Sequence, residues 1–285
     1  MRRIFQGRRM LRGPVLLLSL VVGVFSVLIL TQAPARSASN TVSTNPSDIA
    51  AGAVLYEVHC QSCHGYQGKG GVVSGAPALV NVGAAAADFY LTTGRMPLNA
   101  PSNEALRHHP AFSDAQIQEL DAYVNALPQI TGQGTAGPTI PSPEPLCSAA
   151  QQNSPTSVDL ATQDPGCVTL SEGQQLYAVN CAQCHQAAGS GGMLSGGNVI
   201  PTLHNANLIQ AYEAPLIGPK PMPIFSQLSH AQLSAIAQYV QYLKKPSNPG
   251  GFGISGFGPV AEGFFGILVG FVLLWFASRM IGNRG

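Results

Sequence analysis

The stretch Cys-Gln-Ser-Cys-His at residues 60–64 decides the interpretation of this sequence, and Cys-Ala-Gln-Cys-His at residues 181–185 repeats it. In a Cys-x-x-Cys-His motif the two thiols add to the vinyl groups of a haem, and the adjoining histidine binds the iron. Two copies therefore predict two covalently bound haem c groups, which are attached outside the cytoplasmic membrane and usually carry single electrons. The predicted thioether residues are Cys60, Cys63, Cys181 and Cys184, and the predicted proximal ligands are His64 and His185.

Other roles exist for such cysteines. One Cys-x-x-Cys pair followed by histidine can be a redox dithiol or half of a zinc site. Two pairs can form a zinc ribbon, but the motifs at residues 60 and 181 lie much farther apart than the halves of a usual ribbon. Each motif also brings its own repeated flanking sequence. The haem interpretation is therefore preferred.

Composition narrows the class of protein. The formal net charge is +1, which argues against a nucleic-acid partner. Charged residues make up 9% of the chain, against roughly 25% of a typical soluble protein. Part of this deficit lies in two apolar segments, one near each end of the chain. The 32 glycines and 22 prolines indicate long loops around cofactors and a proline-rich linker.

The N-terminal segment, residues 1–35, places several arginines before an apolar run from Gly13 to Thr31. This order is typical of a secretory signal peptide, although the run is longer than an ordinary signal core. About 20 apolar residues also suffice to span a bilayer. We expect either a cleaved signal peptide or, slightly preferred, a retained membrane anchor. In both cases the chain that follows lies outside the cytoplasm.

The C-terminal segment is the clearer membrane span. Residues 259–278 are almost free of charge, and the tail at 279–285 begins with Arg279. Basic residues beside a span favour the cytoplasmic side. We therefore expect a transmembrane helix in contact with lipid, a cytoplasmic C-terminus and haem domains on the outer face of the cell membrane. Residues 246–258 are rich in glycine and predict a flexible hinge.

An internal repeat surrounds the two motifs. Each copy has a Gly-x-x-Leu-Tyr sequence before the motif, a glycine-rich loop, a Pro-x-Leu and a Met-Pro after it, and a final amphipathic stretch that opens with Ser-x-x-Gln. The Ser-x-x-Gln sequences predict capping boxes. Apolar residues at helical spacing predict the two final helices. They are Ile117, Leu120, Val124 and Leu127 in the first copy and Leu233, Ile236, Val240 and Leu243 in the second.

The repeat predicts two haem domains, at residues 48–128 and 168–245. Residues 129–167 between them are rich in proline, glycine, serine and threonine, and we expect an irregular connector. Cys147 and Cys167 are the two cysteines left over from haem attachment. An even remainder in an oxidising compartment predicts a disulfide, the alternative being two free buried thiols.

The sixth iron ligand is predicted to be methionine. A thioether ligand favours ferrous iron and suits a cytochrome of high potential. Met96 and Met222 occupy matching positions in the repeat, and each precedes a proline that stiffens the loop. Met193 is an alternative in the second copy. Histidines could replace the methionines, namely His59, His108, His109, His204 and His230. With two ligands bound the iron has no open position, which favours outer-sphere electron transfer.

Each unit, with its helix, haem motif, loop, Met-Pro and final helix, resembles a class I cytochrome c domain, so the expected fold is mainly α-helical. Two such domains between an apolar N-terminus and a C-terminal membrane helix resemble the dihaem cytochrome c subunit of the actinobacterial quinol–cytochrome c reductase, the cytochrome bcc complex. The resemblance implies an electron carrier within an oxidoreductase and translocase of the respiratory chain. It also implies three partners: a cytochrome b subunit, a Rieske iron–sulfur subunit and an aa3-type oxidase. Residues 60–64 with Met96, and 181–185 with Met222, match the haem positions of the family.

Three rivals stay open. The dihaem subunit of a cbb3-type oxidase carries its anchor before the haem domains, unlike the span at 259–278. A cytochrome that serves a periplasmic dehydrogenase is also possible. A dihaem peroxidase would need an iron with a displaceable ligand, which the equivalent Met-Pro sequences in both halves disfavour.

Overall fold

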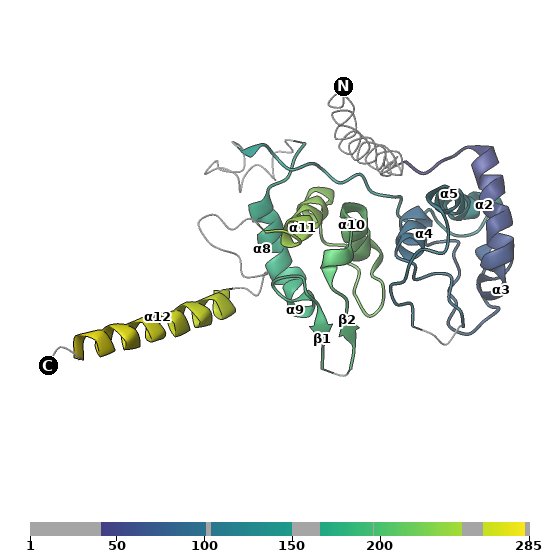
Figure 1. Ribbon diagram of the computed structural model, residues 1–285. Helices are drawn as coiled ribbons and strands as arrows, with labels where there is room; N and C mark the ends of the chain where they lie inside the picture. Colours follow the sequence, from purple (N-terminus) through teal and green to yellow (C-terminus); the bar gives the residue numbers. More distant parts are fainter. Residues whose placement is uncertain (1–40, 101–103, 150–165, 196, 247–258, 283–285) are drawn as a thin grey trace, which may run out of the picture.

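The computed structural model describes residues 41–100, 104–149, 166–195, 197–246 and 259–282 (Figure 1). Two small helical domains follow one another along the chain, and one long helix lies at the C-terminal end. The mainly helical class expected from the repeat is confirmed. The predictions for residues 1–35 and for nearly all of the hinge fall outside the described residues.

The first domain is built from two long helices that cross and a shorter one beside them. The packing partners are α2 with α5 and α4 with α5. Their core is the buried apolar face of α5 together with Tyr56 of α2. The elements are α2 (Pro46–His59), α3 (Gln61–His64), η1 (Tyr66–Gly68), α4 (Gly83–Thr92) and α5 (Asp114–Thr131).

The second domain repeats this arrangement and adds a small hairpin. Helix α8 packs on α11, and α10 packs on α11 as α4 does on α5. Strands β1 and β2 are antiparallel, with Met193 opposite Val199. The elements are α8 (Leu170–Asn180), α9 (Ala182–His185), β1 (Gly192–Met193), β2 (Val199–Ile200), η2 (Leu203–Asn205), α10 (Leu208–Ile217) and α11 (His230–Leu243).

One glycine in each domain allows the long helices to cross closely. A Cβ atom on Gly52 would lie 2.0 Å from the carbonyl oxygen of Glu119 on α5. A Cβ atom on Gly173 would lie 2.2 Å from the carbonyl oxygen of Ala235 on α11. Only a residue without a side chain fits at either crossing. The repeated Gly-x-x-Leu-Tyr sequence thus sets the distance between the first and last helix of each domain.

The predicted capping boxes and amphipathic faces are confirmed. Ser113 accepts a hydrogen bond from the Gln116 amide and Ser229 from the Gln232 amide, with the glutamine side chain reaching back in both cases. The periodic apolar residues of α5 are all buried, as are those of α11 except Leu243, which is half-buried. The serine boxes satisfy amides that the first helical turn leaves without partners.

The described part of the connector that follows α5, residues 132–149, runs along both domains as an extended strap. On the first domain the Ala85 amide donates to the Pro138 carbonyl over 3.0 Å. On the second, the Glu144 amide donates to Ser234 Oγ over 3.1 Å. A disulfide joins Cys147 to Cys167, with Cα atoms 4.9 Å apart. The strap is therefore held at several points, although it has little regular secondary structure.

The two helical domains meet through α4 and α10, which lie side by side in the middle of the molecule (Figure 1). Gln210 of α10 is only 4% exposed and bonds to the first domain twice. Its Nε2 donates to Thr92 Oγ1 over 3.1 Å, and its Oε1 accepts from Arg107 Nη2 over 2.9 Å. A buried, satisfied polar group of this kind gives the junction a specific geometry.

Helix α12 (Pro259–Gly282) differs from every other helix of the described residues in its surface. Its apolar side chains are exposed, Phe271 for example by 69%. Residues 263–282 are long and apolar enough to cross a membrane. Near its end the Arg279 guanidinium lies over the Trp275 ring, 5.2 Å from the centroid.

Candidate haem sites

Each haem motif forms one tight turn at the end of a long helix. In the first domain α2 ends at His59, and the amide of His64 donates to the carbonyl of Cys60 over 2.9 Å. In the second, the amide of His185 donates to the carbonyl of Cys181, also over 2.9 Å. The turn brings both cysteines and the histidine of each motif onto neighbouring positions of one short helix. One haem would therefore be within reach of the two thiols, which would hold it, and of the imidazole, which would bind its iron.

The two motif histidines are oriented by the same contact. His64 Nδ1 lies 2.9 Å from the carbonyl oxygen of Pro77, and His185 Nδ1 lies 3.1 Å from that of Pro201. A carbonyl oxygen only accepts, so Nδ1 carries the proton and Nε2 keeps its lone pair for a metal. Such a bond to the second ring nitrogen is usual for metal-bound histidines. The repeated Pro-x-Leu sequence supplies this acceptor in both domains.

Burial supports the ligand role of the second histidine. It lowers the pKa of His185, against a smaller opposing effect from the Pro201 hydrogen bond. The neutral imidazole, which is the form that binds a metal, is favoured.

A tyrosine in each domain holds the residue that follows the histidine. The buried Tyr56 hydroxyl donates to the Gly65 carbonyl over 2.8 Å, and the Tyr177 hydroxyl donates to the Gln186 carbonyl over 2.7 Å. Burial raises the pKa of both phenols, so they stay protonated donors. From the sequence, these tyrosines are expected only to pack on the haem or its adjoining helix, and their hydrogen bonds were missed. Their matching positions, four residues before the first cysteine, were the signal.

The first cysteine of each motif is favoured as a neutral thiol over a thiolate. Burial, followed by the neighbouring Cys63, raises the pKa of Cys60 to about 11. Burial, followed by Cys184, raises the pKa of Cys181 to about 12. Zinc sites and redox dithiols depend on thiolates. Among the described residues, no three or more His, Cys, Asp or Glu side chains group as a metal site would require. The donor set fits haem c, whose thioethers are neutral.

The two predicted methionine ligands are half-buried. Met96 packs against the core of the first domain, as does Cys60, and its amide donates to the Tyr90 carbonyl over 3.1 Å. The Met222 amide donates to the Pro219 carbonyl over 2.9 Å. Methionine ligation stays a prediction.

The alternative ligands have other surroundings. Met193 is 74% exposed on the hairpin. His204 Nε2 lies 2.8 Å from the Ala188 carbonyl, and His230 Nδ1 lies 2.6 Å from the Tyr212 hydroxyl. The His59 ring packs edge-on against Phe112. The remaining pair, His108 and His109, is exposed.

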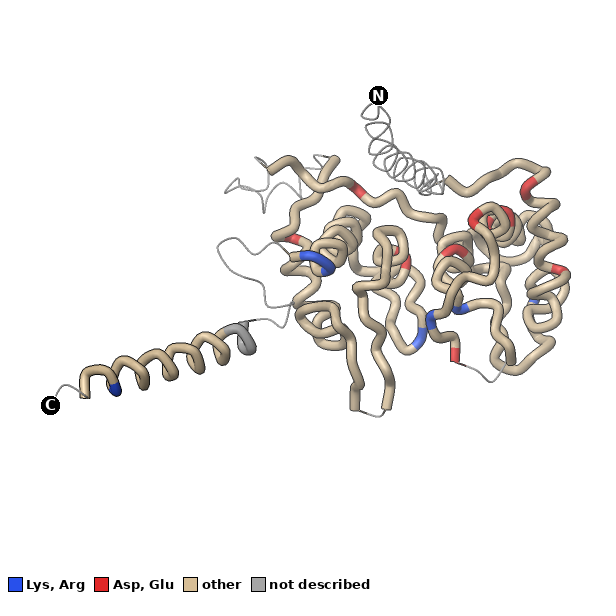
Figure 2. Tube along the Cα trace, viewed as in Figure 1, with Lys and Arg blue, Asp and Glu red and all other residues tan. Residues whose placement is uncertain are grey.

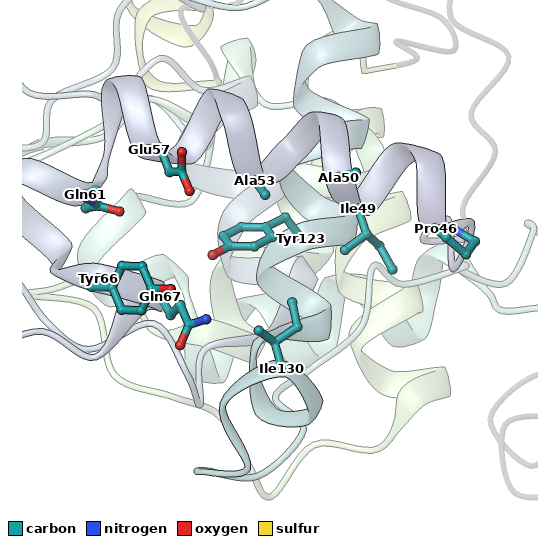
Figure 3. Close-up of a pocket in the computed structure, with 10 residues that line it drawn as sticks. All are labelled: Pro46, Ile49, Ala50, Ala53, Glu57, Gln61, Tyr66, Gln67, Tyr123 and Ile130. Carbon is teal, nitrogen blue, oxygen red and sulfur yellow. The ribbon is translucent and has the colours of Figure 1, made fainter.

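A cavity of about 370 Å³ opens beside the first haem motif but differs from the haem site (Figure 3). It lies between one face of α2, the later turns of α5 and the Tyr66–Gln67 turn, and Tyr123 points into it. The second domain has Gln174 and Ala187 where the first has Ala53 and Tyr66. The lining of this cavity therefore differs between the two domains, whereas the haem motif occurs in both.

Comparisons with known proteins agree with this geometry. A family model described as cytochrome C oxidase, cbb3-type, subunit III matches residues 47–124 and 168–240. These two segments contain the two haem motifs. The model thus describes the kind of domain present twice in the chain.

Several relatives match nearly the whole chain. Each of them is named cytochrome bc1 complex cytochrome c subunit. The protein of Corynebacterium efficiens is 34% identical over 284 residues, which is 98% of this chain and 92% of the relative. That of Mycobacterium tuberculosis is 35% identical over 279 residues, 97% of this chain and 92% of the relative. That of Corynebacterium diphtheriae is 35% identical over 277 residues, 94% of this chain and 92% of the relative.

Proposed function

We propose, since the chain belongs to the family of cytochrome bc1 complex cytochrome c subunits, that it is a dihaem electron carrier between a quinol-oxidising complex and a terminal oxidase. The enzyme is the complex, an oxidoreductase, and this chain is its electron-carrying subunit. The observation that carries the proposal is the duplicated histidine geometry. In both domains a proline carbonyl holds Nδ1 and leaves Nε2 for iron.

We infer two haems, each with one histidine and one methionine ligand. His64 with Met96 would hold one iron, and His185 with Met222 the other. A c-type haem held in this way supplies reversible one-electron transfer at the iron. The side chains have three tasks: the cysteines hold the group, Tyr56 and Tyr177 fix the turn after each histidine, and the thioether favours the reduced state. No residue is required to move a proton.

The proposed partners follow from the family. A cytochrome b subunit would oxidise menaquinol, and a Rieske iron–sulfur protein would pass one electron to the first domain. The second domain would deliver it to an aa3-type oxidase, so that the two domains form a tethered path. The strap and the α4–α10 junction support such a path because they connect the domains directly.

The printed name of the family model keeps the cbb3-type oxidase as the second candidate. That match covers the two haem domains and ends before α12. The relatives named for the bc1 complex match over 94% or more of the chain. The bc1 complex, which is supported by matches over nearly the whole chain, is therefore preferred over the cbb3-type oxidase, which is supported by the two domains alone.

We also propose an orientation in the membrane. Helix α12 would span the lipid with Arg279 at its cytoplasmic end, where basic residues are favoured. The haem domains would then lie on the outer face of the cell membrane. Covalent haem attachment in that compartment is compatible with the disulfide of the connector.

A mild-detergent purification of the tagged chain from its own membranes tests the proposal. We expect b-type haem and an iron–sulfur protein to co-purify, and a reduced menaquinol analogue to reduce the c-type haem quickly. An inhibitor of quinol oxidation should block this reduction, while dithionite should still reduce the haems. If the chain purifies without b-type haem and its haems stay oxidised with menaquinol, the assignment to this complex is wrong.

A further inference from the structure

We propose that Arg95 and Arg107 form a carboxylate-binding site where the two haem domains meet, and that its ligand is a propionate of the haem held by the first domain. The inference rests on the proposed haem content of that domain. It adds a site that distinguishes the first haem from the second.

Arg95 has one hydrogen-bond donor with no acceptor among the described residues. Its Nη1 donates to the Ala105 carbonyl over 2.6 Å, and its guanidinium carbon lies 5.5 Å from the centroid of the Phe89 ring. Its Nε is buried and has no hydrogen-bond partner in the described part of the chain. A buried donor on a charged group is costly when it stays unpaired. An acceptor from outside the protein chain would remove that cost.

Arg107 is held close to Arg95 by the backbone. The His108 amide donates to the Thr93 carbonyl over 3.1 Å, and a Cβ atom on Gly94 would lie 2.4 Å from the His108 carbonyl oxygen. The segment that carries Arg107 is therefore packed directly on residues 93–95. The bond from Arg107 Nη2 to Gln210 then fixes the second guanidinium at the domain junction.

The two positive charges have no acidic partner among the described residues. Within the described ranges, neither Arg95 nor Arg107 forms an ion pair with Asp or Glu, although the exposed Glu104 is close in sequence. Figure 2 shows basic residues gathered where the two domains face each other. Like charges at short range repel, and an anion between them would turn repulsion into attraction.

A haem in the first domain would supply the carboxylate that this site requires, and would lie beside it. Arg95 directly precedes Met96, the predicted ligand, so its backbone belongs to the loop that faces the haem. Haem carries two propionate carboxylates, and guanidinium groups bind carboxylates in a planar, two-bond geometry. Positive charge beside the haem should favour ferrous iron and raise its reduction potential.

The second domain lacks this site. Pro221 occupies the position before Met222, and the nearby Lys220 is exposed. Lys220→Gln therefore serves as a matched control, because it removes one positive charge from the equivalent loop of the other domain.

The test uses the full, haem-loaded chain in detergent without other subunits. Arg95→Gln should make reduction of one haem about tenfold less favourable, which is about 59 mV for one electron. Arg107→Gln should shift the same haem in the same direction by a smaller amount. Arg95→Lys should recover part of the shift, and Lys220→Gln should leave this haem unchanged. Spectroelectrochemical titration gives the potential of each haem.

Further measurements distinguish an effect of charge from loss of the methionine ligand, and failure of this site from failure of the proposed function. The near-infrared band of methionine-bound ferric haem should persist in Arg107→Gln, which shows that the shift comes from charge and not from loss of Met96. Unchanged potentials in both glutamine variants would overturn the site. A shift that appears only after the other subunits bind would also overturn the propionate as ligand, in favour of a partner's carboxylate. Fewer than two haems in the unmodified chain would instead contradict the proposed function.

Discussion

The two helical domains have the same contacts around the Cys-x-x-Cys-His motif, which we call the shared frame, and differ in the residues around that frame. Both have a glycine at the helix crossing, a tyrosine bonded to the carbonyl after the histidine, and a proline carbonyl on Nδ1. The first has an arginine before its methionine and a cavity beside α2. Among the described residues, only the second has a β-hairpin, formed by β1 and β2. The parts proposed to attach a haem are thus repeated, while the parts that would set its potential and its contacts are free to differ.

Replacement of the predicted methionine ligands should have the largest effect on each domain. Met96→Leu and Met222→Leu should each lower the potential of one haem and open its iron to carbon monoxide, because leucine cannot ligate. Met193→Leu should do neither. Carbon monoxide difference spectra and redox titration measure both effects. If Met193→Leu opens the second iron and Met222→Leu does not, the ligand of that domain is assigned wrongly.

The helix crossings should respond almost equally in the two domains. Gly52→Ala or Gly173→Ala places a Cβ atom about 2 Å from a carbonyl oxygen of the opposite helix. Overpacking of this kind costs about 3 kcal/mol, offset by about 1 kcal/mol of helix propensity. Thermal unfolding followed by circular dichroism should therefore show a clear loss of stability. Val58→Ala, at a position 70% exposed on α2, is the control and should change little. Equal stability of both glycine variants and the control would contradict the close crossing.

The tyrosine hydroxyls should have a moderate effect. Tyr56→Phe and Tyr177→Phe keep the ring packing but leave a carbonyl without its donor, which costs about 1.5 kcal/mol. We expect lower stability with two haems still attached, as measured by unfolding and by haem content. A stability unchanged in both variants would show that water replaces the hydroxyl. A difference between them would show how far the two frames diverge.

The capping boxes should give the smallest effect. Ser113→Ala and Ser229→Ala each remove the acceptor for an amide in the first turn of α5 or α11. A loss of about 1 kcal/mol is expected for each. Ser→Asp at the same positions should restore stability, since aspartate also caps. Equal destabilisation by alanine and aspartate would mean that the cap bond is not the cause.

Much of the frame could be predicted because it depends on local sequence. Capping boxes and the faces of α5 and α11 follow from residues three and four apart. Helices α4 and α10 were not predicted. Helix α4 is rich in alanine, and α10 contains Pro215, so neither shows a clear apolar period. Their packing against α5 and α11, and against each other, stabilises them instead.

Some residues of the candidate sites could likewise be identified from the sequence, and others only from the fold. The cysteines and histidines were identified from spacing, since haem attachment requires them within five consecutive residues. The unused donor of Arg95 and its neighbour Arg107 could not be found in this way, because they come together only when the segment around residue 107 folds onto residues 93–95.

Sequence by itself determined the number of haem motifs, the choice of histidines proposed as proximal ligands, the amphipathic helices and the apolar C-terminal segment. Each depends on residue type and short spacing, which the chain carries in any conformation. Tertiary structure alone decided the orientation of His64 and His185, the glycine crossings and the junction through Gln210. These depend on backbone groups from distant segments. Every residue has a backbone carbonyl, so residue type does not show which carbonyl will accept a given hydrogen bond.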